Sequence, residues 1–148
     1  MNKAIYLDMD GTIANFYSVP NWLKSLLSED STPYEIAKPL LNLSILARYL
    51  NKLQRAGYTI GIISWTSKNC SDSFAENIKR AKLEWLKRHL PSVQFDSIVV
   101  CPYGTPKSRY GLSGGYLFDD ECANRQEWYS IGEPFSEKEL ISVLKRLA

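Results

Sequence analysis

Cysteine and histidine are scarce in this sequence: its 148 residues include three cysteines and one histidine. Cys70, Cys101 and Cys122 are odd in number and widely spaced, which excludes the disulfide framework of a small secreted protein. They form no CxxC pair, so a structural zinc site is not expected either. This cysteine usage predicts reduced thiols and a cytoplasmic protein.

Long hydrophobic runs and an excess of charge are also missing. No run approaches the roughly 18 apolar residues of a membrane-spanning helix, and the apolar segment before Asp8 is too short for a signal peptide. The net charge of +2 argues against strong binding of nucleic acid through bulk charge. With 45% apolar and 23% charged residues, the sequence predicts a single globular domain over residues 1–148.

Short apolar runs alternate along the chain with stretches of helical periodicity. The runs, which predict strands buried on both faces, cover residues 4–7, 58–63, 97–101 and 116–118. The helical stretches cover residues 43–53, 74–85 and 140–147. Ser136 and Glu139 have the spacing of a capping box before the last of these helices.

This alternation predicts an α/β fold, a Rossmann-like three-layer α/β/α sandwich with a mainly parallel sheet. Residues 16–40 lie between the first strand and the first long helix, and they predict a small cap insertion. We expect one short helix within it, around Trp22 and Leu26. Neither an internal repeat nor a linker interrupts the pattern.

Each predicted strand is followed by polar residues, and these residues are not needed for packing. The carboxyl ends of parallel strands meet at one edge of the sheet, where ligands bind in open α/β folds. The residues that follow the four strands are Asp8 and Asp10, Ser64 and Thr66, Lys107, and Asp119 and Asp120. We therefore expect four carboxylates, a hydroxyl and a lysine to converge there.

A cluster of carboxylates requires a cation or a proton, because ionised carboxylates repel one another. Mg²⁺ is the cation expected, since it is bound by carboxylates together with phosphate oxygens and water. A phosphate monoester fits the other groups of the cluster. Lys107 would neutralise its charge, the Ser64 hydroxyl would hold one oxygen, and turn amides near Gly11 and Thr12 would donate to others.

The pair Asp8 and Asp10 predicts two-step chemistry. One carboxylate can attack phosphorus and form an aspartyl-phosphate. The other can protonate the leaving oxygen and then activate the water that hydrolyses the intermediate. Their i, i+2 spacing at a strand end points both side chains to one face, and Gly11 permits the sharp turn that follows.

Each of these features alone has a simpler explanation. Paired aspartates cap turns and helices, a serine can leave a strand as an ordinary polar residue, and a lysine is commonly a solvated charge. Their occurrence in order after successive strands favours the joint interpretation.

With these residues, the sequence resembles the haloacid dehalogenase superfamily of phosphohydrolases. The segment DMDGT at residues 8–12 matches the first motif of that family, and Ser64, Lys107 and the segment FDD at 118–120 resemble the other three. The resemblance covers residues 5 to about 128. It implies that Asp8 is the nucleophile and Asp10 the general acid and base.

The same resemblance implies the ligands of the site. Ser64 and Lys107 would bind the transferring phosphoryl group, with Trp65 beside them. Mg²⁺ would be held by Asp8, by the backbone carbonyl of Asp10 and by one of Asp119 or Asp120. Which member of that last pair is the direct ligand stays open.

Two details resemble the C-type 5'-nucleotidase (deoxyribonucleotidase) branch of the superfamily. The first is the segment LDMDGTIANF at residues 7–16, whose final aromatic, Phe16, would stack on a base, together with Trp65. The second is DDE at 119–121 followed by Asn124 and Trp128. The short insertion, and Glu121 where an arginine often follows the paired aspartates, depart from that branch.

The expected function is Mg²⁺-dependent hydrolysis of a phosphomonoester, with a small phosphorylated partner, most simply a (deoxy)nucleoside monophosphate. One alternative is a 3'-phosphatase acting on nucleic-acid ends, although no basic stripe supports it. Another is a non-hydrolytic phosphoacceptor or nucleotide-binding module. A phosphoacceptor receiver has its acidic pair after the first strand and a lone acceptor aspartate later, and the order here differs. The oligomeric state stays open.

Overall fold

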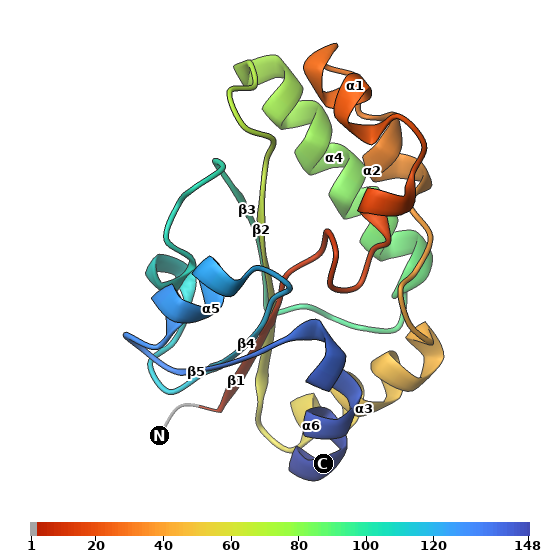
Figure 1. Ribbon diagram of the computed structural model, residues 1–148. Helices are drawn as coiled ribbons and strands as arrows, with labels where there is room; N and C mark the ends of the chain where they lie inside the picture. Colours follow the sequence, from red (N-terminus) through yellow and green to blue (C-terminus); the bar gives the residue numbers. More distant parts are fainter. Residues whose placement is uncertain (1–2) are drawn as a thin grey trace.

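A parallel five-stranded sheet forms the centre of the molecule in the computed structural model, which describes residues 3–148 (Figure 1). Every pairing between neighbouring strands is parallel. Across the sheet the strands are β3 (Ser97–Cys101), β2 (Thr59–Trp65), β1 (Ala4–Leu7), β4 (Tyr116–Phe118) and β5 (Glu133–Phe135). The first strand thus lies in the middle, as a doubly wound α/β sheet requires.

Helices cover both faces of this sheet. On one face lie α3 (Leu43–Arg55), α4 (Asp72–His89) and α6 (Leu140–Leu147), and on the other lies α5 (Cys122–Trp128) (Figure 1). Alternate residues of β1 point to the two faces: Ile5 joins the cluster with the three helices, and Tyr6 packs against Trp128. These observations confirm the predicted three-layer α/β/α sandwich.

The insertion after β1 contains more structure than expected. It comprises a 3₁₀ turn η1 (Phe16–Ser18) and two short helices, α1 (Trp22–Leu27) and α2 (Thr32–Ile36), where one helix was predicted. The second helix begins because Pro33 occupies its first turn and Asp30 accepts the Thr32 N–H at 3.0 Å. The insertion packs on α4 through a separate apolar cluster that includes Phe16, Tyr34 and Ile78.

The edge strand β5 was not predicted, and neither was α5. Strand β5 has three residues, and its central Pro134 has no N–H to donate to a sheet, so its sequence does not resemble a strand. It pairs with β4 alone. The predicted capping box is present, but it opens the 3₁₀ turn η3 (Glu137–Glu139), which leads directly into α6. Within residues 3–148, none of the helices has the length and apolar character of a membrane span.

Candidate active site

The order of the strands brings the predicted site residues to one edge of the sheet. Asp8 follows β1, which lies between β2 and β4. Ser64, in β2, and Asp119, directly after β4, therefore flank it on the two sides. All three side chains are buried, at 6%, 0% and 0% relative exposure. The predicted convergence of the strand ends is what the fold produces.

Lys107 reaches this edge from the 3₁₀ turn η2 (Lys107–Tyr110). Its Nζ lies 2.9 Å from Asp8 Oδ1 and 2.7 Å from Asp119 Oδ2, and its side chain is 1% exposed. Burial alone would lower the pKa of this lysine, but the two carboxylates outweigh burial and raise it. Lys107 is thus a fixed cation at the centre of the cluster.

A second pair of hydrogen bonds holds the turn that carries Lys107. Glu127, on α5, accepts the backbone N–H of Ser108 at 3.0 Å, and its other oxygen accepts the Ser108 hydroxyl. This connection from η2 to α5 fixes the backbone next to the lysine. No feature of the sequence pattern singled out Glu127.

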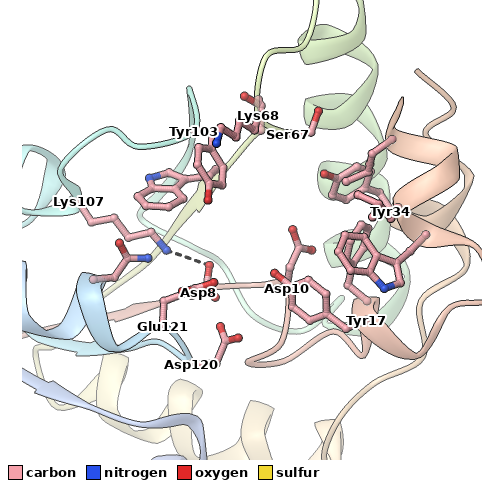
Figure 2. Close-up of a pocket in the computed structure, with 17 residues that line it drawn as sticks. Asp8, Asp10, Tyr17, Tyr34, Ser67, Lys68, Tyr103, Lys107, Asp120 and Glu121 are labelled. Carbon is pink, nitrogen blue, oxygen red and sulfur yellow. Dashed lines mark hydrogen bonds and ion pairs between the residues drawn. The ribbon is translucent and has the colours of Figure 1, made fainter. Parts of the chain in front are cut away.

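Asp119 and Asp120 have different environments. The oxygens of Asp119 accept from Lys107, from Asn124 Nδ2 at 3.1 Å and from the Glu121 N–H at 2.9 Å. Asp120 is partly exposed and lines the cavity in front of Asp8 (Figure 2). Carboxylate oxygens of Asp8, Asp119 and Asp120 nevertheless lie within 4.8 Å of one another.

The charge of this cluster is unbalanced. Four carboxylates (Asp8, Asp10, Asp119 and Asp120) face two buried lysines, which leaves two negative charges in excess when all six groups are ionised. Burial and the neighbouring Asp8 raise the pKa of Asp119 to about 6 and that of Asp120 to about 8. Burial also opposes ionisation of Asp8, but Lys107 outweighs it and lowers the pKa of that carboxyl.

Three converging carboxylates with excess negative charge fit a hard divalent cation that prefers oxygen ligands. No sulfur or imidazole donor belongs to the cluster of carboxylates in the described chain, which argues against zinc. Asp8 and Asp120 line the cavity and Asp119 does not, so the first two are the members of the cluster that a cation in the cavity can reach.

Gly11 and Thr12 form a tight turn rather than a set of free donors. The amide of Gly11 donates to Ala14 O at 2.9 Å and that of Thr12 to Met9 O at 3.1 Å. Both amides are used within the turn, so the phosphate donors predicted near Gly11 and Thr12 are to be sought among the neighbouring amides. The Thr12 hydroxyl donates to Asp8 Oδ2 at 3.0 Å and accepts the Asp120 N–H at 3.2 Å.

Other amides of the same turn are available. Among the hydrogen bonds of residues 3–148, none uses the backbone N–H of Met9 or of Asp10. Gly11 has a φ of +82°, and a Cβ there would lie 2.3 Å from Asp120 Oδ2. The turn therefore requires glycine at this position both for its conformation and for its contact with the acidic pair.

Asp10 has a partner that the sequence analysis missed. Lys82, on α4, is 1% exposed, and its Nζ lies 3.0 Å from Asp10 Oδ2. The signal was present in the helical pattern: Lys82 occupies the apolar stripe that includes Ile78 and Trp85, both buried. A lysine in the buried stripe of a helix indicates a partner inside the protein.

A cavity of about 360 Å³ opens in front of Asp8 and Asp10. Aromatic side chains form its two sides, with Tyr103 on one and Tyr17 and Tyr34 on the other, and the carboxylates lie between them (Figure 2). The first side comes from the ends of the sheet and the second from the insertion after β1. Ser67 and Lys68, which follow β2, lie at the rim.

Two aromatic residues proposed as ligand contacts have structural roles as well. The indole N–H of Trp65 donates to Thr105 O at 2.9 Å, so it is not free for a phosphate oxygen. Its ring lies below the Lys107 ammonium, 5.4 Å from the centroid. Phe16 lines the cavity but is 2% exposed, while its neighbour Tyr17 is 47% exposed.

Comparison with known proteins gives a fold but no sequence relative. No family model matches the chain, and no curated protein matches it in sequence. A D,D-heptose 1,7-bisphosphate phosphatase from B. bronchiseptica, complexed with magnesium and phosphate, is 17% identical with a TM-score of 0.62, over 98% of this chain and 97% of its own.

Two further solved structures are similar over nearly the whole chain. The D,D-heptose 1,7-bisphosphate phosphatase from Burkholderia thailandensis is 14% identical with a TM-score of 0.63, over 99% of this chain and 98% of its own. The HAD domain of the effector protein Lem4 from Legionella pneumophila is 15% identical with a TM-score of 0.52, over 99% and 93%. At these identities the likeness establishes the fold, and the chain therefore has the haloacid dehalogenase-like α/β fold that its motifs predict.

Proposed function

We propose that this protein is a Mg²⁺-dependent phosphomonoester hydrolase that works through an aspartyl-phosphate on Asp8. The observation that supports the proposal is the position of the Asp8 carboxylate and the charged groups around it. Asp8 lies at the floor of an open cavity, fixed by the buried Lys107, with Asp119 and Asp120 within 4.8 Å. A nucleophile, a fixed cation and a divalent-cation site in one cavity are the parts that phosphoryl transfer needs.

The residues that would hold Mg²⁺ are Asp8, Asp120 and the backbone carbonyl of Asp10. Asp119 would act behind them as the anchor of Lys107, because its oxygens already accept three hydrogen bonds. Bound Mg²⁺ would neutralise the phosphate and orient it toward Asp8. The charge of the cluster supports this assignment, because even with Asp10 protonated three carboxylates face the two buried lysines, which leaves one negative charge in excess.

In the first step, an Asp8 oxygen forms a bond to phosphorus while the bond to the leaving oxygen breaks. Asp10 donates its proton to that oxygen, so the product leaves as an alcohol. In the second step, a water molecule attacks the phosphorus of the aspartyl-phosphate, the bond from phosphorus to the Asp8 oxygen breaks, and Asp10 takes the water's proton. Burial raises the pKa of Asp10, although Lys82 opposes this, and a raised pKa favours the protonated acid.

Several groups are suited to hold the phosphoryl oxygens during both steps. Lys107 has two acceptors in the described chain, so its third proton is available to a ligand. Ser64 supplies a hydroxyl, and the amides of Met9 and Asp10 point to no other acceptor within residues 3–148. These donors replace the amides of Gly11 and Thr12 in the proposed site.

The substrate we propose is a (deoxy)nucleoside monophosphate. The cavity of about 360 Å³ has the size of a small-molecule site, and aromatic rings form both of its sides. A base stacked on such a ring gains about 1–3 kcal/mol. Tyr17 and Tyr103, at 47% and 54% exposure, are the rings best placed for this contact, while Phe16 and Trp65 support them from behind.

The test is release of inorganic phosphate with and without Mg²⁺. The panel contains 5'- and 3'-(deoxy)nucleotides, a 3'-phosphorylated oligonucleotide, sugar phosphates and 4-nitrophenyl phosphate, and the Asp8→Asn variant is the blank. We expect metal-dependent release from the nucleotides and none from Asp8→Asn. Activity confined to the oligonucleotide would favour the nucleic-acid alternative, and activity confined to sugar phosphates would overturn the nucleotide assignment. Folded protein without any activity would favour a binding or phosphoacceptor role.

A matched pair of variants tests the base contact itself. Tyr17→Ala should raise the KM for a nucleotide by about 10-fold and leave the KM for glycerol phosphate unchanged. Tyr129→Ala is the control, because Tyr129 is exposed and does not line the cavity. Equal KM values for Tyr17→Ala and Tyr129→Ala on the nucleotide would contradict the contact.

A further inference from the structure

Lys82 is among the largest fully buried side chains of the described molecule. It extends from the middle of α4 toward the site, where its ammonium group lies 5.1 Å from the centroid of the Tyr34 ring. A lysine is seldom buried to this degree unless its charge and its protons all have partners. The partners of Lys82 therefore indicate what it does.

Three acceptors surround the ammonium group. Lys82 Nζ lies 3.0 Å from Asp10 Oδ2, 2.5 Å from Ser64 Oγ and 2.7 Å from the backbone carbonyl of Trp65. A lysine ammonium has three protons and accepts no hydrogen bond. All three protons are thus used within the protein, so Lys82, unlike Lys107, has none left for a phosphate.

This arrangement fixes two groups of the proposed site. Because the Ser64 oxygen accepts from Lys82, the hydroxyl proton of Ser64 must point to another acceptor, and it is directed away from the lysine. Because Asp10 Oδ2 is held by Lys82, the other carboxyl oxygen of Asp10 is left for the cavity. Figure 2 shows the Asp10 side chain extending into that cavity.

We propose that Lys82 is a positioning residue, which sets the Asp10 carboxyl for the leaving oxygen and the Ser64 hydroxyl for the phosphoryl group. The inference rests on the proposed function, since it assigns Lys82 a task within that reaction. It also means that α4 helps to set the geometry of the site, although the other buried residues of this helix belong to apolar clusters. A purely structural role for Lys82 would affect all substrates alike.

The test compares two leaving groups. Nitrophenolate leaves as a stable anion, whereas the alkoxide of a nucleotide needs a proton from Asp10. The quantity measured is kcat/KM, which covers the steps up to departure of the leaving group and excludes hydrolysis of the intermediate. We expect Lys82→Met to lower kcat/KM by about 10²-fold for a nucleoside 5'-monophosphate and by less than about 10-fold for 4-nitrophenyl phosphate.

The control is Lys79→Met, which removes an exposed lysine from the same helix and should leave both values unchanged. An equal loss on the two substrates, or no loss, would overturn the inference while the proposed function stands. A wild-type protein that releases phosphate from neither substrate overturns the proposed function, and this inference with it.

A second variant covers the case in which Lys82→Met does not fold. The double variant Lys82→Met/Asp10→Asn removes both charges of the buried pair, so neither is left uncompensated. If Lys82 acts through Asp10, the double variant should have the same ratio of nucleotide to aryl kcat/KM as Asp10→Asn alone. A further fall of that ratio would indicate that Lys82 acts on the substrate directly, and it would refute the positioning role.

Discussion

Adjacent residues of the site carry different tasks, and Asp119 and Asp120 are the clearest case. Asp119 is fully buried and binds Lys107 at 2.7 Å, whereas Asp120 lines the cavity. The two positions therefore separate the support of the lysine from the binding of a metal. A substitution at each position tests that separation.

We expect Asp119→Asn to destabilise the fold by about 2 kcal/mol, because Lys107 keeps Asp8 as its partner but loses one of its two buried carboxylate acceptors. Asp120→Asn should keep the fold and abolish the rise in Tm that Mg²⁺ gives the wild-type protein. Thermal unfolding of both variants, with and without Mg²⁺, distinguishes them. The assignment of the two residues would be reversed by the opposite result. In that case Mg²⁺ would still raise the Tm of the Asp120→Asn variant, and the Asp119→Asn variant would be stable but would show no rise in Tm with Mg²⁺.

The sequence predicted the identity of most site residues because their types and their positions after strands are local features. Asp8 and Lys107 could be placed in this way, and the fold brings both to the expected edge. The apolar stripe of α4 marks Lys82 as a buried lysine, but the sequence does not show that its partners are Asp10 and Ser64, because that depends on how α4 packs on the sheet. The use of the Gly11 and Thr12 amides within the turn could not be predicted either, because the hydrogen bonds of a tight turn depend on its conformation, which the residue types do not define.

Short elements decide where the lysine of the site lies. The turn η2 has no apolar face of its own to fix it, and Glu127 of α5 holds it through Ser108. The helix α5 was not predicted, since it has seven residues and little periodicity to detect. The long α4 and the apolar strands were predictable because their patterns repeat over several turns or residues.

Glu127→Ala should therefore lower activity without unfolding the protein. The variant leaves Ser108 without its acceptor and frees the backbone beside Lys107, so we expect kcat/KM to fall at least about 10-fold. The free energy of unfolding should fall by only about 1 kcal/mol. Steady-state kinetics and chemical denaturation measure the two effects.

Glu76→Ala is the matched control, because Glu76 is exposed on α4. Ser108→Ala should give a smaller loss than Glu127→Ala, since the hydrogen bond from the Ser108 backbone remains. If Glu127→Ala had the activity of Glu76→Ala, the contact between η2 and α5 would have no part in positioning Lys107.

For the molecule as a whole, the excess negative charge of the site makes the free energy of unfolding depend on the pH and on the binding of Mg²⁺. The folded, metal-free protein holds Asp119 with a pKa of about 6 and Asp120 with a pKa of about 8, while both have a pKa of about 4 in an unfolded chain. Between about pH 4 and pH 8 the folded state thus binds protons that the unfolded state has released. The contribution of these two carboxyls to the free energy of unfolding therefore falls as the pH rises through this range.

The lowered pKa of Asp8 acts in the opposite direction, but only below the ordinary value of a carboxyl. We therefore expect the Tm of the metal-free protein to be lower at pH 8 than at pH 5. Mg²⁺ binds the deprotonated carboxylates, so it should raise the Tm more at pH 8 than at pH 5. Differential scanning calorimetry with Mg²⁺ or with EDTA measures both effects.

Asp120→Asn isolates the contribution of the site from the rest of the molecule. The substitution removes the carboxyl with the highest of these pKa values, so the metal-free variant should lose less stability than wild type between pH 5 and pH 8. The difference between the two proteins cancels the effect of all other titrating groups. If the Tm of the metal-free wild type rose between pH 5 and pH 8 by the same amount as that of Asp120→Asn, the prediction would be contradicted. Repulsion within the acidic cluster would then not lower the stability of the metal-free protein.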